Sequence, residues 1–497
     1  MRRLFFNSTI VIFILLAIII IWNTSLWWIA LLFAPLIILG YIDYFQKSNN
    51  IRRTYPLLGR LSNLIEKQRH VIQEILLLDR KEGEPFNWIE KEIAFKRADN
   101  HLMNQPFGTQ LPYSETGREW LLHTTYPTKG EKEDFRVKIG SGLCKQPYNS
   151  SILNIGGMSY GSISSNATLA LNGGAQIGGF AQNTGEGGLT DYHEKHGADL
   201  IFQFGTGYFG CRDEEGNFDK NKFKEIANND LVKMVEIKVS QGAKPGYGAM
   251  LPASKNTKEI AKYRDIDPHE DVESPPNHSA FSNHLEMINF IDELRTLSNG
   301  KPIGIKLCIG NEAEFEEMIK SFVEKNSYPD FITIDGAEGG TGAAHLEALH
   351  WVGMPLEEAL YFVNKTLSKS NLRKEIKIIA GGKLISAFDL FKMFSLGADA
   401  CYSARAMMIA LGCVQSLKCN SDACPTGITT MVPSRVASLV VNDKKAKVAN
   451  YHKNTLDGLN DLLTASGSST LKKIKKTSIM RRVSHSKVIS LEELYPS

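Results

Sequence analysis

The sequence has almost no excess of charge of either sign. Its 497 residues contain 57 Lys and Arg against 54 Asp and Glu, which gives a formal net charge of +3. This balance excludes the strongly basic surface that nucleic-acid-binding proteins use, so we expect no nucleic acid as a partner. The hydrophobic content of 43% is sufficient for a full core and lies outside the range of disordered or collagenous chains.

Cysteine is scarce, and its distribution excludes the disulfide framework of a small secreted protein. There are seven cysteines, an odd number, and most are scattered. Three lie close together as C-x5-C-x4-C, at Cys413, Cys419 and Cys424, with Pro425 following. Thiolates are soft metal ligands, and a Cys-Pro ending is common in iron–sulfur loops. Three thiolates suit a three-iron cluster, or a four-iron cluster with an outside ligand, whereas zinc usually needs a fourth Cys or His. Three buried thiols without metal are the alternative.

Charge is absent from two long runs near the N-terminus. Residues 9–22 (TIVIFILLAIIIIW) carry none, and residues 4–6 extend this run until it nearly spans a hydrocarbon core of ~30 Å. A polar break at residues 23–25 precedes a second uncharged run over residues 26–41. The pattern predicts a transmembrane helical hairpin over residues 1–42. A signal peptide is the alternative, but no small-x-small cleavage site follows the first run.

The charges that flank the hairpin predict its orientation. Arg2 and Arg3 precede it, and Lys47, Arg52 and Arg53 follow it. The positive-inside rule places both ends in the cytoplasm, so we expect a membrane protein whose remaining chain is cytoplasmic.

Two further segments flank the central part of the chain. Residues 43–149 are predicted to be a helical and irregular linker that packs on the next domain. Its apolar residues follow helical spacing at Leu58, Leu61, Leu64, Ile65, Ile72, Ile75 and Leu76. Residues 441–497 form a basic C-terminal extension, which either contacts anionic lipid or is a solvated tail.

From residue 150 onward, short apolar runs alternate with helical segments. The predicted strands are residues 152–155, 177–181, 200–204, 234–239, 303–308, 331–334, 376–380 and 400–403. The predicted helices are residues 166–173, 283–297, 312–325, 355–369 and 387–396. Eight such units predict parallel pairing and an α/β fold, a closed (β/α)8 TIM barrel over residues 150–440. An open, doubly wound sheet is the alternative.

The turns after these strands carry polar residues and glycine pairs, as the active end of such a barrel requires. The glycine pairs indicate a backbone that approaches a flat or phosphorylated ligand closely. Phosphate often binds after strands seven and eight, although a simple tight turn would also explain two glycines. The candidate cofactor-binding residues are Gly157, Met158, Ser159, Gln203, Lys238, Gln241, Lys306, Gly340, Thr341, Gly381, Gly382, Ser403 and Arg405.

Taken together, the motifs resemble the FMN-binding synthase domain of glutamate synthases. More narrowly, they resemble stand-alone glutamate synthase-related proteins that carry only this domain. The matching segments are NIGGMSYGSIS (154–164), NTGEGG (183–188), VEIKVSQGAKPGYGAMLP (235–252), IAKYR (260–264), SPPNH (274–278), IGIKLCIG (303–310), DGAEGGTGAA (335–344), AGGKLISAFDL (380–390) and GCVQSLKCNSDACPTGI (412–428).

The resemblance implies FMN at the barrel mouth and a 3Fe-4S cluster on the three cysteines. It implies the reductive amination of 2-oxoglutarate with ammonia to L-glutamate. Lys244 and Arg264 match the residues that hold the 2-oxoglutarate carboxylates, and Glu186 matches a residue near the substrate. Lys306 and Lys238 end strands, where a lysine beside a flavin can stabilise negative charge on the reduced ring. An ion pair with Glu236 or Asp335 is the alternative for either lysine.

The sequence also departs from the family pattern. Met250 stands where the large glutamate synthases have Gln, and PPNHS (275–279) replaces PPPHHD. These changes leave two alternatives open: an FMN-dependent oxidoreductase on another 2-oxo acid, or a membrane electron-transfer subunit.

Two features of the large enzymes are not found. We expect no glutaminase domain, because no residues remain for one. There is also no convincing dinucleotide fingerprint. Electrons would then come from a reductase subunit, from ferredoxin, or from freely bound nicotinamide.

Overall fold

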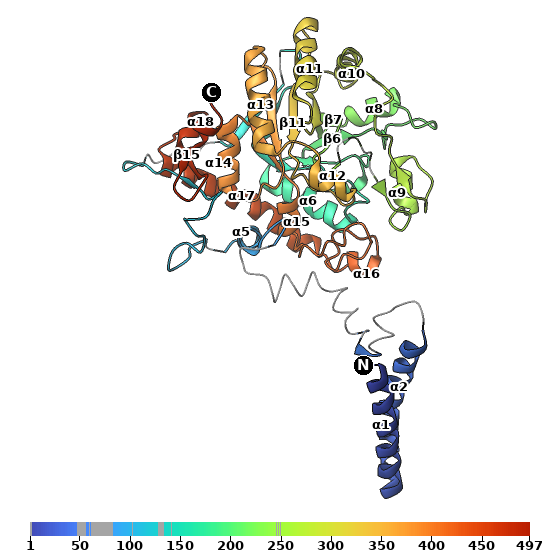
Figure 1. Cartoon of the computed structure of the whole chain (residues 1–497). Helices are drawn as coiled ribbons and strands as arrows, with labels where there is room; N and C mark the ends of the chain where they lie inside the picture. Colours follow the sequence, from blue (N-terminus) through green and yellow to red (C-terminus); the bar gives the residue numbers. More distant parts are fainter. Residues whose placement is uncertain are drawn as a thin grey trace. The chain divides into compact units, whose positions relative to one another are not determined.

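The computed structural model of the chain describes residues 2–46, 56–58, 60, 83–101, 103–127, 134–140, 142–244, 246, 248 and 250–497 (Figure 1). The chain divides into two compact units, Met1–Gly83 and Glu84–Ser497. The predicted helix positions Leu61, Leu64, Ile65, Ile72, Ile75 and Leu76 lie outside the described residues.

The first unit contains two apolar helices, α1 (Arg2–Trp22) and α2 (Trp28–Phe45), joined by the short helix η1 (Thr24–Leu26). Both α1 and α2 are long and apolar enough to cross a membrane by length and composition. A Cβ on Gly40 would overlap the Phe5 ring, so glycine permits the close approach of the two helices. Thr9 Oγ1 and Tyr41 OH form a hydrogen bond of 2.9 Å in the same contact.

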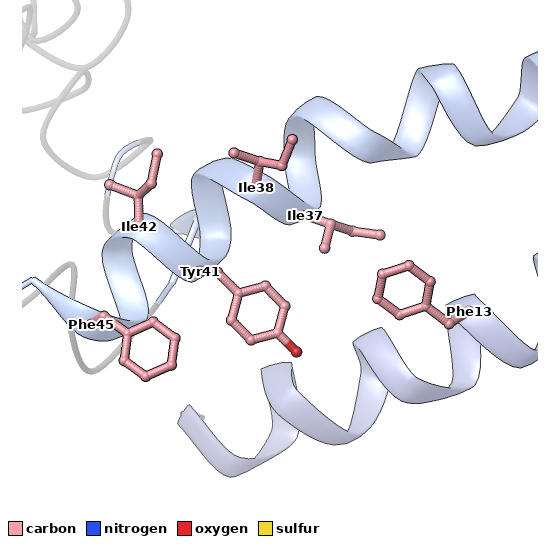
Figure 2. Close-up of a pocket in the computed structure, with 6 residues that line it drawn as sticks. All are labelled: Phe13, Ile37, Ile38, Tyr41, Ile42 and Phe45. Carbon is pink, nitrogen blue, oxygen red and sulfur yellow. The ribbon is translucent and has the colours of Figure 1, made fainter.

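An apolar groove lies along these two helices (Figure 2). Phe13 comes from α1, and the other lining residues come from α2: Ile37, Ile38, Tyr41, Ile42 and Phe45. The outer surface of the unit is also apolar, because most of its large hydrophobic side chains are exposed.

The second unit is built on a closed barrel of eight parallel strands in the order β4-β5-β6-β7-β10-β11-β12-β13. Pairing of β13 with β4 closes it, with Cys401 opposite Leu153. This closure confirms the predicted TIM barrel and excludes the open, doubly wound sheet. The strands are β4 (Leu153–Ile155), β5 (Gln182–Asn183), β6 (Leu200–Phe204), β7 (Val232–Lys238), β10 (Ile303–Leu307), β11 (Phe331–Asp335), β12 (Lys377–Gly381) and β13 (Ala400–Ser403).

Helices surround the strands (Figure 1). They are α6 (Ser165–Gly178), α7 (Asp191–Glu194), α8 (Lys220–Ala227), α9 (Lys258–Arg264), α10 (His284–Leu297), α11 (Glu312–Lys325), α12 (Leu346–Trp351), α13 (Leu356–Lys369), α14 (Ala387–Leu396), α15 (Arg405–Ala410) and α16 (Pro433–Val436). The predicted bounds of α11 and α14 are confirmed, because Asn311 and Ser386 cap their first turns with side-chain oxygens. The loop after β7 also contains the short strands β8 (Met250–Leu251) and β9 (Val272–Glu273).

The predicted second strand is wrong. Residues 177–181 were expected to be extended, but Ile177 and Gly178 are the last residues of α6. The helix ends at Gly179, which has a φ of +66° and supplies the left-handed cap. The barrel strand β5 therefore begins only at Gln182, and it is two residues long.

The inside of the barrel changes from apolar to polar along the strands. Near their beginnings, Ile201, Met234 and Phe331 form a buried cluster with Ile139 and Tyr148. The last two residues belong to the antiparallel hairpin of β2 (Arg136–Ile139) and β3 (Tyr148–Ser151). Two residues further along β6, β7 and β11, the same inward face carries the polar residues Gln203, Glu236 and Thr333, because side chains alternate along a strand. The hairpin therefore closes the apolar end, and the polar end is free to form a site.

Segments from both sides of the barrel in sequence complete the second unit. α5 (Trp88–Ala98) packs on α17 (Val441–Ser466), and α17 packs on α6. β1 (Glu119–Leu121) forms an antiparallel sheet with β14 (Ile479–Arg482) and β15 (Val488–Ser490), and α18 (Leu491–Leu494) follows. The C-terminal extension is thus folded onto the barrel, and the expectation of a solvated tail is wrong.

A cluster of four charged residues joins this C-terminal sheet to the barrel helices. Arg481 of β14 pairs with Glu119 of β1 and with Glu357 of α13. Lys392 of α14 contacts the same two carboxylates, at 2.8 Å and 2.6 Å. All four side chains are largely buried, so each charge depends on its partners for compensation.

We predict that Arg481→Met lowers the free energy of unfolding by about 1–3 kcal/mol, because two buried carboxylates would then share one lysine. Urea denaturation followed by circular dichroism measures this change. Lys487→Met, at an exposed position between β14 and β15, should have almost no effect. Equal losses in the two variants would contradict the role of the cluster.

Candidate functional site

Four charged residues meet where β5, β7 and α9 end. Glu186 lies in the loop after β5, Lys238 ends β7, Lys244 follows in the next loop, and Arg264 ends α9. Glu186 and Lys238 form an ion pair, and both side chains are largely buried. Lys244 and Arg264 are also buried and act electrostatically on Glu186. The structure thus brings together the predicted residues Glu186, Lys238, Lys244 and Arg264.

Burial and mutual attraction set the protonation of this group. Burial tends to raise the pKa of Glu186, but Lys238, Lys244 and Arg264 outweigh it, and the pKa falls to about 2. Burial lowers the pKa of Lys244 to about 8, against the attraction of Glu186. Burial likewise lowers the pKa of Arg264 to about 10. At neutral pH the group therefore contains one carboxylate and three cations.

Arg264 is held by the loop that follows β4. Its Nη2 donates to the Tyr160 carbonyl at 3.0 Å and to Ser159 Oγ at 3.4 Å. The guanidinium also lies over the Phe209 ring, 5.0 Å from the ring centre. Its Nε is buried and has no hydrogen-bond partner among the described residues. Arg264 is therefore fixed in position while retaining a free donor.

A second ion pair lies on the neighbouring strands. Lys306 of β10 is 3.4 Å from Asp335, the last residue of β11. Asp335 also accepts a hydrogen bond of 3.1 Å from the Gly242 N–H. Burial tends to lower the pKa of Lys306, but Asp335, Glu236 and Glu186 raise it, so the ammonium stays charged. The ion-pair alternative for Lys306 is confirmed, whereas Lys238 pairs with Glu186 instead of Glu236 or Asp335.

Gly157 lies against two amide side chains from the barrel interior. A Cβ at this position would be 2.9 Å from Gln203 Oε1 and 3.0 Å from Asn183 Oδ1. Only glycine allows this approach without displacing either amide. Both amides donate to the carboxylate of Glu236. Glu236 is not among the predicted site residues; its spacing of two residues from Lys238, which puts both on the inward face, is the signal that identifies it.

The predicted phosphate-binding residues lie on the opposite strands, and their side chains already have protein partners. Arg405 donates to the Glu338 carbonyl and lies 4.9 Å from the centre of the Phe86 ring. The Ser403 hydroxyl donates to the Leu384 carbonyl at 2.8 Å. Three more predicted residues lie on this side, namely Gln241, Gly340 and Thr341. Gln241 donates to the Gly340 carbonyl at 3.3 Å, and Thr341 donates to the Ala343 carbonyl at 3.3 Å.

The main chain is the remaining source of phosphate donors there. Gly382 has a φ of +147°, a conformation that glycine adopts readily. A Cβ on Gly381 would be in ordinary van der Waals contact, with Asp335 Oδ1 as its nearest atom at 3.7 Å, and the residue itself is buried. Phosphate binding at these glycines remains a prediction, and it rests on backbone N–H groups. Met158, the remaining predicted residue, is buried next to Gly157.

The three clustered cysteines do not assemble into a metal site in this structure. Cys413 Sγ accepts from the Gln415 N–H at 3.5 Å, and Cys424 Sγ lies 3.4 Å from Thr426 Oγ1. Burial raises the pKa of Cys419. Burial also tends to raise the pKa of Cys424, but hydrogen bonds from Thr426 and Thr429 outweigh it and lower this pKa. Within the described part of the chain, no three His, Cys, Asp or Glu side chains gather closely enough to hold a metal ion.

The two places where the sequence departs from the family pattern, Met250 and the segment 275–279, have different surroundings. Met250 lies in β8 opposite Glu273 and is 43% exposed. His278 is buried: its Nε2 donates to the Lys238 carbonyl at 3.0 Å, and Tyr208 OH donates to its Nδ1 at 3.0 Å. Burial lowers the pKa of His278 to about 4, so the ring is neutral and supports the end of β7.

Comparison with known proteins identifies the family of the chain. The conserved region in glutamate synthase matches residues 131–469. The glutamate synthase large subunit-like protein YerD of Bacillus subtilis (strain 168) is 32% identical over 94% of this chain and 97% of that protein. The archaeal glutamate synthase [NADPH] of Methanocaldococcus jannaschii is 34% identical over 64% of this chain and only 59% of that protein.

Among solved structures, mandelate oxidase covers 79% of this chain and 99% of its own, with 14% identity and a TM-score of 0.45. That likeness is too low to transfer any chemistry. The family match covers more than half of the chain, and the relationship to YerD extends over nearly all of both proteins. The chain belongs to the glutamate synthase family of oxidoreductases.

Proposed function

We propose that the chain is an FMN-dependent oxidoreductase that reductively aminates 2-oxoglutarate with ammonia to give L-glutamate. One observation carries this proposal: Lys238, Lys244 and Arg264 converge on the single carboxylate of Glu186. Three cations and one carboxylate leave a formal charge of +2, which complements the two carboxylates of 2-oxoglutarate. Fixed cations in a buried site bind carboxylates more strongly than the same groups in water do.

Lys244 and Arg264 are the proposed carboxylate-binding residues. Lys238 is committed to Glu186, whereas neither Lys244 nor Arg264 takes part in an ion pair closer than 4.0 Å among the described residues. Arg264 also retains a free buried Nε donor. Glu186 stays ionised down to about pH 2, so it can accept hydrogen bonds from ammonia and from the amino group that forms at carbon 2 of the substrate.

The residues present also fit FMN. Gly157 lets backbone approach the Gln203 and Asn183 amides, and two residues without side chains, Gly381 and Gly382, stand at the end of β12 on the far side. Lys306, kept charged by Asp335, places a positive charge at the barrel mouth. When bound, reduced FMN would supply the hydride for the carbon that ammonia has attacked with loss of water. Lys306 would stabilise negative charge on the reduced ring.

The substrate can be tested directly. Purified protein with chemically reduced FMN and ammonium is incubated with a panel of 2-oxo acids, and amino-acid products are measured by mass spectrometry. We expect glutamate from 2-oxoglutarate and much less product from monocarboxylic acids, which leave one cation unpaired. Met250, exposed where the large enzymes have Gln, motivates a second candidate, an oxidoreductase for another 2-oxo acid. Turnover of a different acid alone would favour that candidate.

Mutating the two proposed carboxylate ligands should weaken 2-oxoglutarate binding. Lys244→Ala and Arg264→Ala should each cost about 2–4 kcal/mol, roughly 30- to 1000-fold in affinity, because a charge-assisted contact is lost. Titration of the bound-flavin spectrum with 2-oxoglutarate measures the dissociation constant. Lys262→Ala, which removes an exposed lysine from the same helix, is the matched control and should bind normally. Normal affinity in both site variants would exclude these residues as the carboxylate ligands.

The same titration should depend on pH. As pH rises through about 8, Lys244 loses its proton and its charge, so the affinity for 2-oxoglutarate should fall. Lys244→Arg should keep its charge and move this fall to a higher pH, towards the pKa of about 10 of Arg264. An identical alkaline fall in the wild type and in Lys244→Arg would show that another group titrates.

We also propose a 3Fe-4S cluster on Cys413, Cys419 and Cys424. The support is their spacing in the sequence and the Cys-Pro ending; the present positions of the thiols give none, so no step of the reaction is assigned to a cluster. Serine at any of the three positions should remove protein-bound iron from anaerobically purified protein, whereas Cys308→Ser should retain it. Equal iron content in all four variants, measured by elemental analysis, would refute the cluster.

The N-terminal unit is proposed to anchor the enzyme in a membrane, with the barrel in the cytoplasm and with a reductase or ferredoxin as electron donor. The support is the length and apolar composition of α1 and α2. A chain without residues 1–83 should remain in the supernatant after ultracentrifugation and keep its flavin, because the candidate site lies in the second unit. Sedimentation of that shortened chain with membranes would show that another surface is responsible.

A further inference from the structure

Glu236 is a carboxylate that the proposed reaction does not use. It lies in β7 inside the barrel and is completely buried. Its Oε1 accepts hydrogen bonds from Asn183 Nδ2 of β5, at 2.9 Å, and from Gln203 Nε2 of β6. Its Oε2 accepts from Thr333 Oγ1 of β11. The nearby lysines pair with other carboxylates, Lys238 with Glu186 and Lys306 with Asp335.

These contacts determine how two amide side chains are oriented. An amide group has an NH2 donor on one side and a carbonyl acceptor on the other, whereas a carboxylate only accepts. Both NH2 groups must therefore face Glu236, and both amide oxygens must point away from it. Asn183 Oδ1 accepts from the Gly185 N–H at 2.9 Å. The Gln203 amide lies against Gly157, with Oε1 2.9 Å and Nε2 3.1 Å from where a Cβ would be.

Each amide reaches a different part of the candidate site. Gly185 directly precedes Glu186, so Asn183 fixes the start of the loop that carries this carboxylate. The Gln203 amide lies against the turn after β4, where the glycine pair begins. If the NH2 group and oxygen of Asn183 exchanged places, the Gly185 N–H would lose its acceptor.

We infer that Glu236 is a positioning residue: by accepting from Asn183 and Gln203, it turns the Asn183 oxygen towards Gly185 and holds the Gln203 amide in place against Gly157. One buried carboxylate thereby orders both the Glu186 loop and the side of the barrel that faces the cofactor. The part that concerns the cofactor rests on the proposed function, whereas the ordering of the Glu186 loop does not. Such a residue needs its acceptor atoms, and its charge is not required.

Two substitutions separate the acceptor from the charge. Glu236→Gln keeps the shape, and its Oε1 can still accept from both amides. Its new NH2 group can donate to Thr333 Oγ1, because a hydroxyl accepts as well as donates. Glu236→Leu has similar size but no acceptor. The inference predicts that Glu236→Gln resembles the wild type and that Glu236→Leu does not.

Hydrogen–deuterium exchange of the full chain without flavin tests the loop. Peptides that cover residues 183–188 should exchange about tenfold faster in Glu236→Leu, because the Gly185 N–H loses a fixed acceptor. They should exchange at the wild-type rate in Glu236→Gln. Equally fast exchange in both variants would overturn the inference, because it would show that the loop depends on the charge of Glu236 and not on its acceptor atoms. Unchanged exchange in Glu236→Leu would show that the loop does not depend on Glu236 at all.

Flavin binding tests the second part, through fluorescence-quenching titration and the visible spectrum of bound FMN. Glu236→Gln should bind within about twofold of the wild type with the same spectrum, whereas Glu236→Leu should bind about tenfold more weakly with shifted maxima. Gln203→Leu should produce the same shift while leaving Glu236 with two partners, and this variant replaces Glu236→Leu if the latter does not fold. The inference would be contradicted if Gln203→Leu had the wild-type flavin spectrum, or if Glu236→Gln had the shifted maxima expected for Glu236→Leu. A wild-type protein that binds no FMN would refute the proposed cofactor, and the exchange experiment would still decide on Glu236.

Discussion

The compensation of one buried carboxylate by three cations is the constraint on which the candidate site depends. Charged groups are costly to bury unless they are paired, and Glu186 is stable in this environment because Lys238, Lys244 and Arg264 surround it. The converse also holds: three buried cations would repel one another without Glu186. The pair formed with Lys238 satisfies only part of this charge, so the free protein retains a cationic site. The two negative charges of a dianionic substrate would neutralise the positive charge that Glu186 leaves unpaired.

The barrel positions these charges by dividing its interior into levels. The apolar level contains Met234 and Phe331 and is closed by the β2–β3 hairpin. The amide level follows, where Glu236 joins side chains from β5, β6 and β11. The charged level lies at the strand ends, where Lys238 and Lys306 stand on neighbouring strands. Because inward residues recur every second position, a site built on strands is held more rigidly than one built on loops alone.

Much of this could be predicted from the sequence. Alternation of apolar runs and helices identified the barrel, and strong caps such as Asn311 and Ser386 fixed helix bounds. The predicted second strand is wrong because the apolar residues 177–181 suit a strand, whereas the preceding helix continues to Gly178 and ends only at the left-handed Gly179. The basic C-terminus was taken for a solvated tail or a lipid contact because its acidic partners, Glu119 and Glu357, are more than 100 residues away in sequence.

The candidate site was predicted less completely. Motif resemblance identified Glu186, Lys244 and Arg264, but sequence alone could not show that they converge on one another. Glu236 was missed as a site residue because its importance comes from donors on three other strands. The clustered cysteines show the opposite case, since a spacing that suits a metal does not by itself bring the thiols together.

The most direct test of the account is a single-turnover experiment on the full chain with bound FMN. Anaerobically reduced protein is mixed with 2-oxoglutarate, with ammonium, or with both, and flavin reoxidation is followed by absorbance. The account predicts fast reoxidation only with both reactants, and one glutamate formed for each flavin oxidised. Reoxidation by a 2-oxo acid without ammonium, or no reoxidation with both reactants present, would contradict it.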